Sequence, residues 1–122
     1  MQHKIQRVID HIKSNLHRKL MLADLARLAG ISRSRLCYAF KTETGISVGQ
    51  YLRVLRIQKA RELLETTSLS AKEIGGAAGM RDQSHFSRDF KSAYNLTPSE
   101  YRERLSKAGR KDEETGRLAN KQ

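Results

Sequence analysis

Apolar residues recur along most of the chain at the spacing of an amphipathic helix. Near the start, Ile5, Val8, Ile9, Ile12 and Leu16 fall on one side of a helix that turns every ~3.6 residues. The same period continues to about residue 105, and no segment alternates apolar and polar residues over six positions, as a half-buried strand would. The pattern predicts an all-α protein.

Helix-capping residues divide this pattern into seven predicted helices. Ser47, Ser70 and Thr97 each precede a Gln or Glu by three residues, which is the spacing of a capping box. Ser32 and Asp82 are two further residues of the type that caps a helix N-terminus. We therefore expect one domain over 1–105, with a first helix-turn-helix unit over about 22–44, a linker helix over about 48–65 and a second helix-turn-helix unit over about 71–94.

The chain repeats part of its own sequence, which supports two equivalent units. Three identical pairs lie 50 positions apart: Phe40 and Phe90, Lys41 and Lys91, and Tyr51 and Tyr101. Upstream, three related pairs lie 49 positions apart: Leu25 and Ile74, Ala26 and Gly75, and Gly30 and Gly79. One element therefore occurs twice, with a one-residue slip in the loop between its two parts.

Each copy is typical of a helix-turn-helix, in which the first helix braces the unit and the second enters the major groove of DNA. The two helices cross closely, so a small residue is needed at their contact, and Ala26 and Gly75 occupy that place. Gly30 and Gly79 permit the tight turn that follows.

The second helix of each unit has polar residues outside its buried positions. The outward sets are Arg33, Ser34, Cys37, Tyr38 and Lys41 in the first unit, and Gln83, Ser84, His85, Ser87, Arg88 and Lys91 in the second. Phe86, Phe90 and Ala93 are expected to face inward. Arg reads guanine and Gln reads adenine through paired hydrogen bonds, so we expect Arg88 and Gln83 to give the second unit more base specificity. The first unit reads apolar features or mainly positions the protein.

The formal net charge of the chain is +11 at pH 7. The polar tail over 106–122, which we expect to be disordered, carries +2, so +9 belongs to residues 1–105. This balance favours a polyanionic partner, with double-stranded DNA first and an anionic membrane surface second. No apolar run approaches membrane-spanning length, and we expect a cytoplasmic protein without a membrane partner.

Catalytic and metal-binding motifs are absent from the sequence. One cysteine and four histidines form no metal-ligand spacing, and no Gly-rich phosphate loop or nucleophile elbow is present. We expect no catalytic residue, no metal and no cofactor, and therefore not an enzyme. An architectural protein that binds DNA by charge and shape is an alternative, against which Gln83 and Arg88 argue.

A long motif of the second unit resembles a known family. The run Asp82-Gln83-Ser84-His85-Phe86-Ser87-Arg88-Asp89-Phe90-Lys91, followed by Thr97-Pro98 and Tyr101-Arg102, closely resembles the signature of the AraC/XylS family of bacterial transcriptional regulators. Arg56-Ile57 and Ala60 in the linker helix match the same family, and the resemblance covers about residues 3–105. It implies seven helices, with two helix-turn-helix units binding adjacent major grooves.

The resemblance also implies a function and the residues that carry it. The base-reading places of the family fall on Ser34, Cys37, Tyr38, Gln83, Ser84, His85, Ser87 and Arg88. The chain looks most like the small stand-alone members, which implies a monomeric, nucleoid-associated activator that binds an asymmetric site and recruits RNA polymerase. The alternative is the DNA-binding half of a larger ligand-sensing regulator.

Three residues allow more than one interpretation. Cys37 has two interpretations. It is a small residue that faces DNA, or it is a redox sensor whose thiolate is favoured by positively charged neighbours. His85 is a DNA contact rather than a metal ligand, because the sequence places no partner ligand near it. Arg56, within the apolar stretch of the linker helix, braces the two units or contacts a phosphate.

Overall fold

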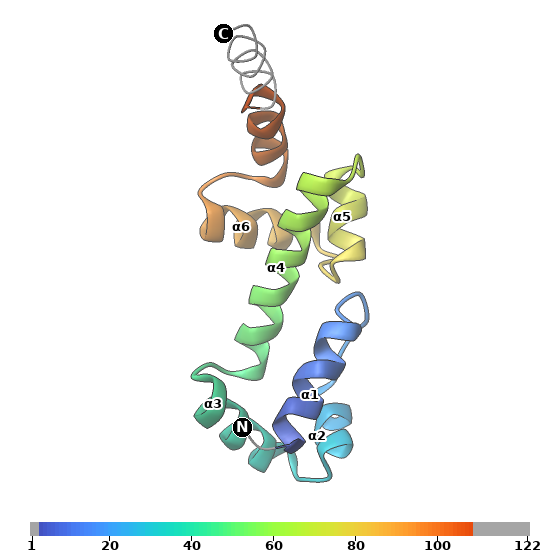
Figure 1. Ribbon diagram of the computed structural model, residues 1–122, viewed down its shortest axis with the longest axis vertical. Helices are drawn as coiled ribbons and strands as arrows, with labels where there is room; N and C mark the ends of the chain where they lie inside the picture. The colour runs from blue at the N-terminus through green and yellow to red at the C-terminus, as the bar shows by residue number, and fades with distance from the viewer. Residues whose placement is uncertain (1–2, 109–122) are drawn as a thin grey trace, which may run out of the picture.

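A computed structural model describes residues 3–108 of the chain. Six helices carry labels in Figure 1: α1 (His3–Ser14), α2 (Leu22–Ala29), α3 (Arg33–Thr44), α4 (Val48–Thr66), α5 (Ala71–Ala77) and α6 (Gln83–Tyr94). A seventh, C-terminal helix covers residues 98–108. No strand occurs within residues 3–108, so the predicted all-α fold with seven helices is confirmed.

The C-terminal helix begins where the sequence places its capping box. The side-chain oxygen of Thr97 accepts from the Glu100 N–H at 3.2 Å, and Glu100 Oε1 accepts from the Thr97 N–H at 2.9 Å. The helix continues through residue 108, three residues past the expected domain end at 105, and Lys107 pairs with Glu103 across one turn at 3.4 Å. The rest of the predicted disordered tail, 109–122, lies outside the described residues.

The helices form two lobes that share α4. The first lobe is α1, α2, α3 and the start of α4, and its core is Ile5, Val8, Ile9, Ile12, Leu25, Ala26, Ala29, Leu36, Phe40 and Val48. The second lobe is the rest of α4 with α5, α6 and the C-terminal helix, and its core is Ile57, Ala60, Leu64, Ile74, Ala78, Phe86 and Phe90. Figure 1 shows α4 running from one lobe to the other. Neither helix-turn-helix unit therefore closes its core without this helix.

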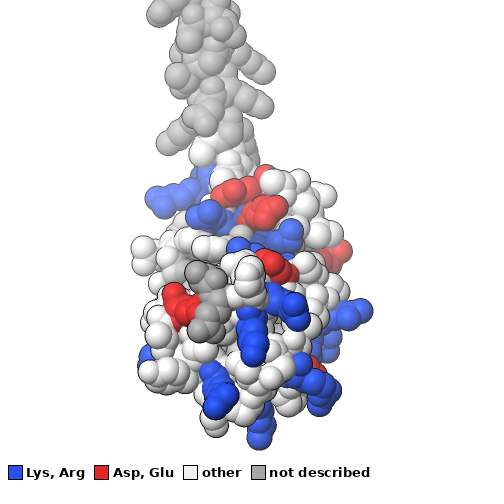
Figure 2. Space-filling view, turned by 60° about the horizontal axis from the view of Figure 1, so that its bottom comes forward, with Lys and Arg blue, Asp and Glu red and all other residues white. Residues whose placement is uncertain are grey.

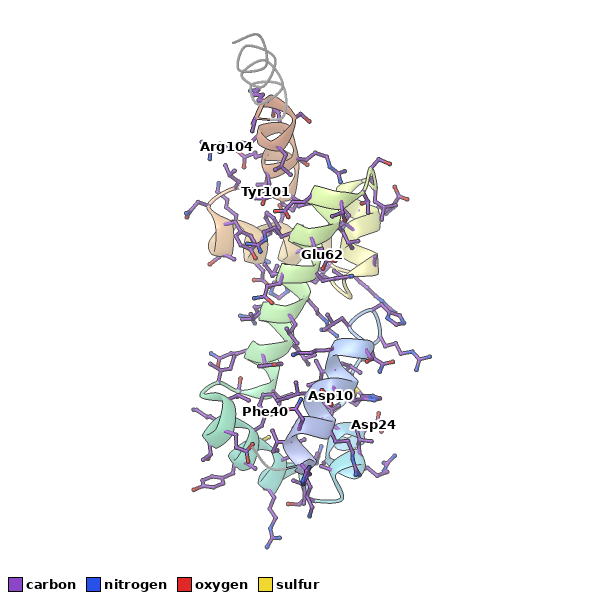
Figure 3. All side chains as sticks on the ribbon, in the orientation of Figure 1. Asp10, Asp24, Phe40, Glu62, Tyr101 and Arg104 are labelled. Carbon is purple, nitrogen blue, oxygen red and sulfur yellow. The ribbon has the colours of Figure 1, made fainter. Side chains whose placement is uncertain are left out.

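The repeated aromatic residues make equivalent ring contacts in both lobes. The rings of Phe40 and Tyr51 meet edge to face, with centroids 5.2 Å apart, and those of Phe90 and Tyr101 do so at 5.5 Å. Figure 3 shows Phe40 within the first lobe and Tyr101 where the C-terminal helix meets the second. Each pair packs the second helix of a helix-turn-helix unit, here called its recognition helix (α3 or α6), against the helix that follows it. This shared contact explains why both residues recur 50 positions apart.

The prediction that Ala93 faces inward is wrong, because Ala93 is exposed. It lies in the last turn of α6, where the neighbouring Tyr94 supplies the packing instead. The Tyr94 ring lies 4.9 Å from that of Phe90 and 6.2 Å from that of Tyr101. Tyr94, rather than Ala93, is therefore the residue of this turn that packs inward.

Capping boxes start α4 and α5 in the same way. Ser47 Oγ accepts from the Gln50 N–H at 3.2 Å and Gln50 Oε1 accepts from the Ser47 N–H at 3.1 Å, while Ser70 and Glu73 make the same two bonds at 3.1 Å each. The backbone and side-chain hydrogen bonds from Ser70 lower the pKa of Glu73. Gln performs the same role at α4 without a charge.

In the part of the chain that the structure describes, no helix is long and apolar enough to span a membrane.

The lowered pKa of Glu73 gives a pH-dependent contribution to stability. The contribution is complete above the unfolded-state pKa of about 4.3 and is lost as the pH falls through the lower folded-state pKa. We expect Glu73→Gln to keep the box and to reduce the fall in unfolding free energy between pH ~7 and pH ~3, measured by chemical denaturation. Glu62→Gln, which removes an exposed carboxylate outside any capping box, is the control. Equal pH dependence in the two variants would contradict the assignment.

Candidate nucleic-acid interface

The turns of the two helix-turn-helix units have the same backbone geometry. After α2 the Ile31 N–H donates to the Ala26 carbonyl at 3.1 Å, and after α5 the Met80 N–H donates to the Gly75 carbonyl at 2.7 Å. Each turn contains a glycine in the left-handed region: Gly30 at φ 69° and Gly79 at φ 85°. These partners lie 49 positions apart, so the turn pattern predicted from the repeat is present in both units.

The one-residue slip in the repeat lies at Arg81. Ser32 caps α3 through the Arg35 N–H at 3.1 Å, and Asp82 caps α6 through the His85 N–H at 3.1 Å, which places the two caps 50 positions apart. Between glycine and cap the first turn has one residue, Ile31, and the second has Met80 and Arg81. The additional residue is an exposed arginine at the start of the second recognition helix.

Close packing at the helix crossing explains the small residues predicted there. A Cβ at Gly75 would lie 2.7 Å from Nε2 of Gln83, 2.8 Å from the carbonyl oxygen of Met80 and 3.2 Å from Cδ2 of Phe86. The equivalent Ala26 is buried, with 3% of its surface exposed. A methyl group at the second crossing would therefore force the Gln83 side chain and the Met80 backbone to shift, whereas the first crossing accommodates one.

The recognition helices α3 and α6 present equivalent faces. Leu36 and Phe40 bury one side of α3, as Phe86 and Phe90 bury one side of α6. Of the predicted site residues, Ser87 is half-buried and the others are exposed: Arg33, Ser34, Cys37, Tyr38, Lys41, Gln83, Ser84, His85, Arg88 and Lys91. Tyr38 is 76% exposed, at the position that Arg88 occupies in α6.

Sequence reasoning left out four exposed residues of this surface. Arg35, Thr42, Arg81 and Ser92 lie on the recognition helices or at their start, and all four are exposed. The helical period could have identified two of them as members of this surface. Thr42 lies four residues after Tyr38 and Ser92 four residues after Arg88, so each lies on the same helix face as the predicted residue before it. Arg35 borders a hollow beside α3 that is also lined by Lys4, Ile31, Ser34, Tyr38 and Ala39.

Gln83 is exposed, as predicted, and its side-chain amide also lies against α5. Gln83 is the first residue of α6, and its Nε2 lies 3.4 Å from the Lys72 carbonyl oxygen in α5 and close over Gly75. Its amide therefore contacts the first helix of its own unit. Arg88 stands one turn further along α6, with Nε 3.4 Å from the Ser84 carbonyl, and remains on the exposed face.

Both recognition helices lie on the same side of α4 in the view of Figure 1, with α2 and α5 on the other side. Figure 2 shows Lys and Arg side chains around the end of the molecule that carries α2 and α3. An ion pair of 3.6 Å between Arg53 and Asp89 also joins α4 to α6. The arrangement offers two polar, exposed helices held on one rigid helix.

Comparison with known proteins identifies the family. A family model described as a helix-turn-helix domain matches residues 25–104. The solved structure of an AraC-type DNA-binding domain protein from Chromobacterium violaceum is 34% identical, with a TM-score of 0.75 over 81% of this chain and 88% of that one. The chain belongs to the AraC/XylS family.

Other AraC/XylS relatives carry the same domain. The DNA-binding domain of the global transcriptional factor AdpA, solved in complex with a target DNA, is 28% identical, with a TM-score of 0.79 over 83% of this chain and 91% of that one. The transcriptional activator NphR of Rhodococcus sp is 37% identical over 87% of this chain, which spans 31% of NphR. The chain covers about a third of the length of the curated relatives that it matches.

The contact of Gln83 with α5 leads to a prediction about this AraC-type domain. We expect Gln83→Ala to lower the free energy of unfolding by about 0.5–1.5 kcal/mol, because an internal hydrogen bond is lost. Its DNA affinity should fall by a similar factor for every base at each site position. Ser84→Ala, at an exposed neighbour, is the control for unfolding. A loss of affinity confined to one A·T pair would instead assign adenine recognition to Gln83.

Proposed function

We propose that the protein is a sequence-specific transcriptional regulator that inserts α3 and α6 into two adjacent major grooves of double-stranded DNA. The observation that carries the proposal is the pair of equivalent, exposed recognition helices on one side of α4. The net charge of +11 fits a partner that carries one negative charge per phosphate. The solved complex of the AdpA domain with a target DNA supports DNA as the partner.

The residues on the recognition helices divide into two proposed roles. Lys41 and Lys91 occupy equivalent places near the ends of the two helices and hold phosphates, because a flexible ammonium binds as a point charge. Tyr38 and Arg88 occupy the centre of the two faces and contact base edges. We propose that the other predicted site residues of the two helices complete the contact with DNA: Arg33, Ser34, Cys37, Ser84, His85 and Ser87.

The two recognition helices differ at their centres, so the proposed DNA site is asymmetric. A tyrosine in α3 stands where α6 has an arginine, and of the two only the arginine can make the bidentate contact with guanine. One chain then supplies both halves of the contact and acts as a monomer. This difference also separates a sequence-specific regulator from an architectural protein, for which the central residues need not differ.

We infer that the protein activates transcription by contacting RNA polymerase from its DNA-bound position. The name of the relative NphR as a transcriptional activator supports activation. DNA binding of this kind needs no catalytic residue, metal or cofactor. We infer that the protein binds the bacterial chromosome in the cytoplasm. The second candidate is the DNA-binding part of a longer, ligand-sensing regulator. That candidate accords with the 31% of NphR that the chain spans, and the DNA contact proposed here is the same for both candidates.

Selection of bound sequences from a random DNA pool tests the proposed geometry. We expect two unlike half-sites whose centres are about 10–10.5 bp apart, one turn of DNA, bound by one chain per site. The stoichiometry is measured by sedimentation of the complex. Palindromic sites bound by a dimer would contradict the proposal, and equal affinity for selected and random DNA would favour the architectural alternative.

Substitutions in α6 separate base recognition from phosphate binding. We expect Arg88→Ala to cost about 1–3 kcal/mol on the selected site and to relax discrimination at one base pair. Lys91→Ala should weaken binding to all sequences about equally, and reduce the slope of log K against log salt by about 0.9. Both variants are titrated against the site and its single-base changes. A uniform loss with Arg88→Ala would make Arg88 a phosphate contact.

A further inference from the structure

Arg56 of α4 joins the shared helix to the end of the first lobe's α1. Its Nε donates to the Leu16 carbonyl at 3.2 Å and its Nη2 donates to the Arg18 carbonyl at 3.0 Å. Both carbonyls lie just beyond the C-terminus of α1, where backbone acceptors lack helical partners and a positive charge is favoured. The guanidinium is half-buried, and this burial lowers the pKa of Arg56. Arginine stays charged at neutral pH all the same.

The turn of the second helix-turn-helix unit packs against the same point. A Cβ added at Gly79 would overlap the Leu16 carbonyl oxygen and would lie 2.9 Å from Nε of Arg56. The end of α1, the middle of α4 and the turn before α6 therefore meet around one guanidinium. Gly79 belongs to the second lobe and Leu16 to the first, so this junction links the two units directly.

The same type of contact occurs a second time in the chain. Arg102 in the C-terminal helix donates to the carbonyls of Thr67 and Leu69, which follow α4 as Leu16 and Arg18 follow α1. In the first half, an arginine of α4 donates to two carbonyls that follow α1. In the second half, an arginine of the C-terminal helix donates to two carbonyls that follow α4. Only the Arg56 contact, of these two, also touches a turn of the other helix-turn-helix unit.

The junction crosses the boundary between the two lobes, which otherwise share only α4. The first lobe packs on the beginning of α4 through Val48, Tyr51, Leu52 and Leu55, and the second lobe packs on its later turns. The two cores share no buried residue. Arg56 and the close approach of Gly79 to Leu16 therefore add a direct contact between the two lobes to the connection through α4.

We propose that Arg56 is a positioning residue that fixes the separation and relative rotation of α3 and α6, and through them the spacing between the two DNA half-sites. The proposal rests on the proposed function for its effect on DNA, but the restraint itself is a property of the free protein. Inserting one base pair lengthens the DNA by about 3.4 Å and rotates one half-site by about 35°. A fixed pair of recognition helices cannot follow both changes.

The restraint is tested without DNA by measuring the distance between the recognition helices. Cys37 is the single cysteine of the chain and is exposed on α3, and Ser92→Cys places a second exposed thiol on α6. Spin labels on both report a distance distribution. We expect a narrow distribution with Arg56 and a broader or shifted one with Arg56→Ala. An unchanged distribution would overturn the proposal, whatever DNA the protein binds.

The effect on DNA is tested with selected sites that carry one or two added or removed base pairs between the half-sites. We expect the protein to lose at least about tenfold in affinity when the spacing changes, since both helices no longer bind together. With Arg56→Ala this spacing penalty should fall to less than about threefold. Arg56→Lys, which keeps the charge and one donor, should be intermediate, and it carries the test if the alanine variant does not fold.

Arg61→Ala is the matched control, because Arg61 lies on the same helix and contacts Glu65 and the Tyr94 ring rather than the first lobe. It should keep the spacing penalty and the narrow distance distribution. If Arg56→Ala instead weakened all spacings equally and reduced the salt slope by about 0.9, Arg56 would be a phosphate contact and the proposal would be wrong. Failure of the unaltered protein to bind any selected site would count against the proposed function alone.

Discussion

Sharing of α4 between two hydrophobic cores is the constraint on which the rest of this structure depends. Val48 completes the first core, while Ile57, Ala60 and Leu64 belong to the second. A helix-turn-helix of two short helices buries too little apolar surface to be stable alone, because each buried Leu or Phe side chain contributes only about 1.5–3 kcal/mol. One helix that packs with both units therefore stabilises them and determines where their recognition helices lie.

The two units keep the same scaffold and differ where they face outward. The edge-to-face pairs of Phe40 with Tyr51 and of Phe90 with Tyr101 are nearly identical in geometry, because ring packing tolerates little change in shape. Tyr38 and Arg88 occupy equivalent exposed places, where no packing constrains the side chain. Internal packing therefore preserves the repeat, while the exposed faces of the two units differ.

Glycine has a distinct role at each of two positions in the second unit. Gly75 permits the crossing of α5 and α6, and Gly79 combines a positive φ with close approach to the Leu16 carbonyl. A helix-interior glycine costs about 1 kcal/mol relative to alanine, so Gly75 weakens α5 locally. Close packing with Phe86 and with the first lobe offsets that cost. The second unit consequently depends more on tertiary contacts than the first, which has alanine at the crossing.

Local patterns in the sequence determined the helices, their caps and the identity of most exposed residues, because periodicity and capping involve residues only three or four positions apart. Only the tertiary structure decided the contacts of Gln83 and Arg56. Gln83 bonds to a carbonyl 11 positions away, and Arg56 bonds to carbonyls 38 and 40 positions away. An exposed glutamine or an arginine in an apolar stretch has several possible partners in sequence, and the folded backbone selects among them by bringing one carbonyl within hydrogen-bond distance.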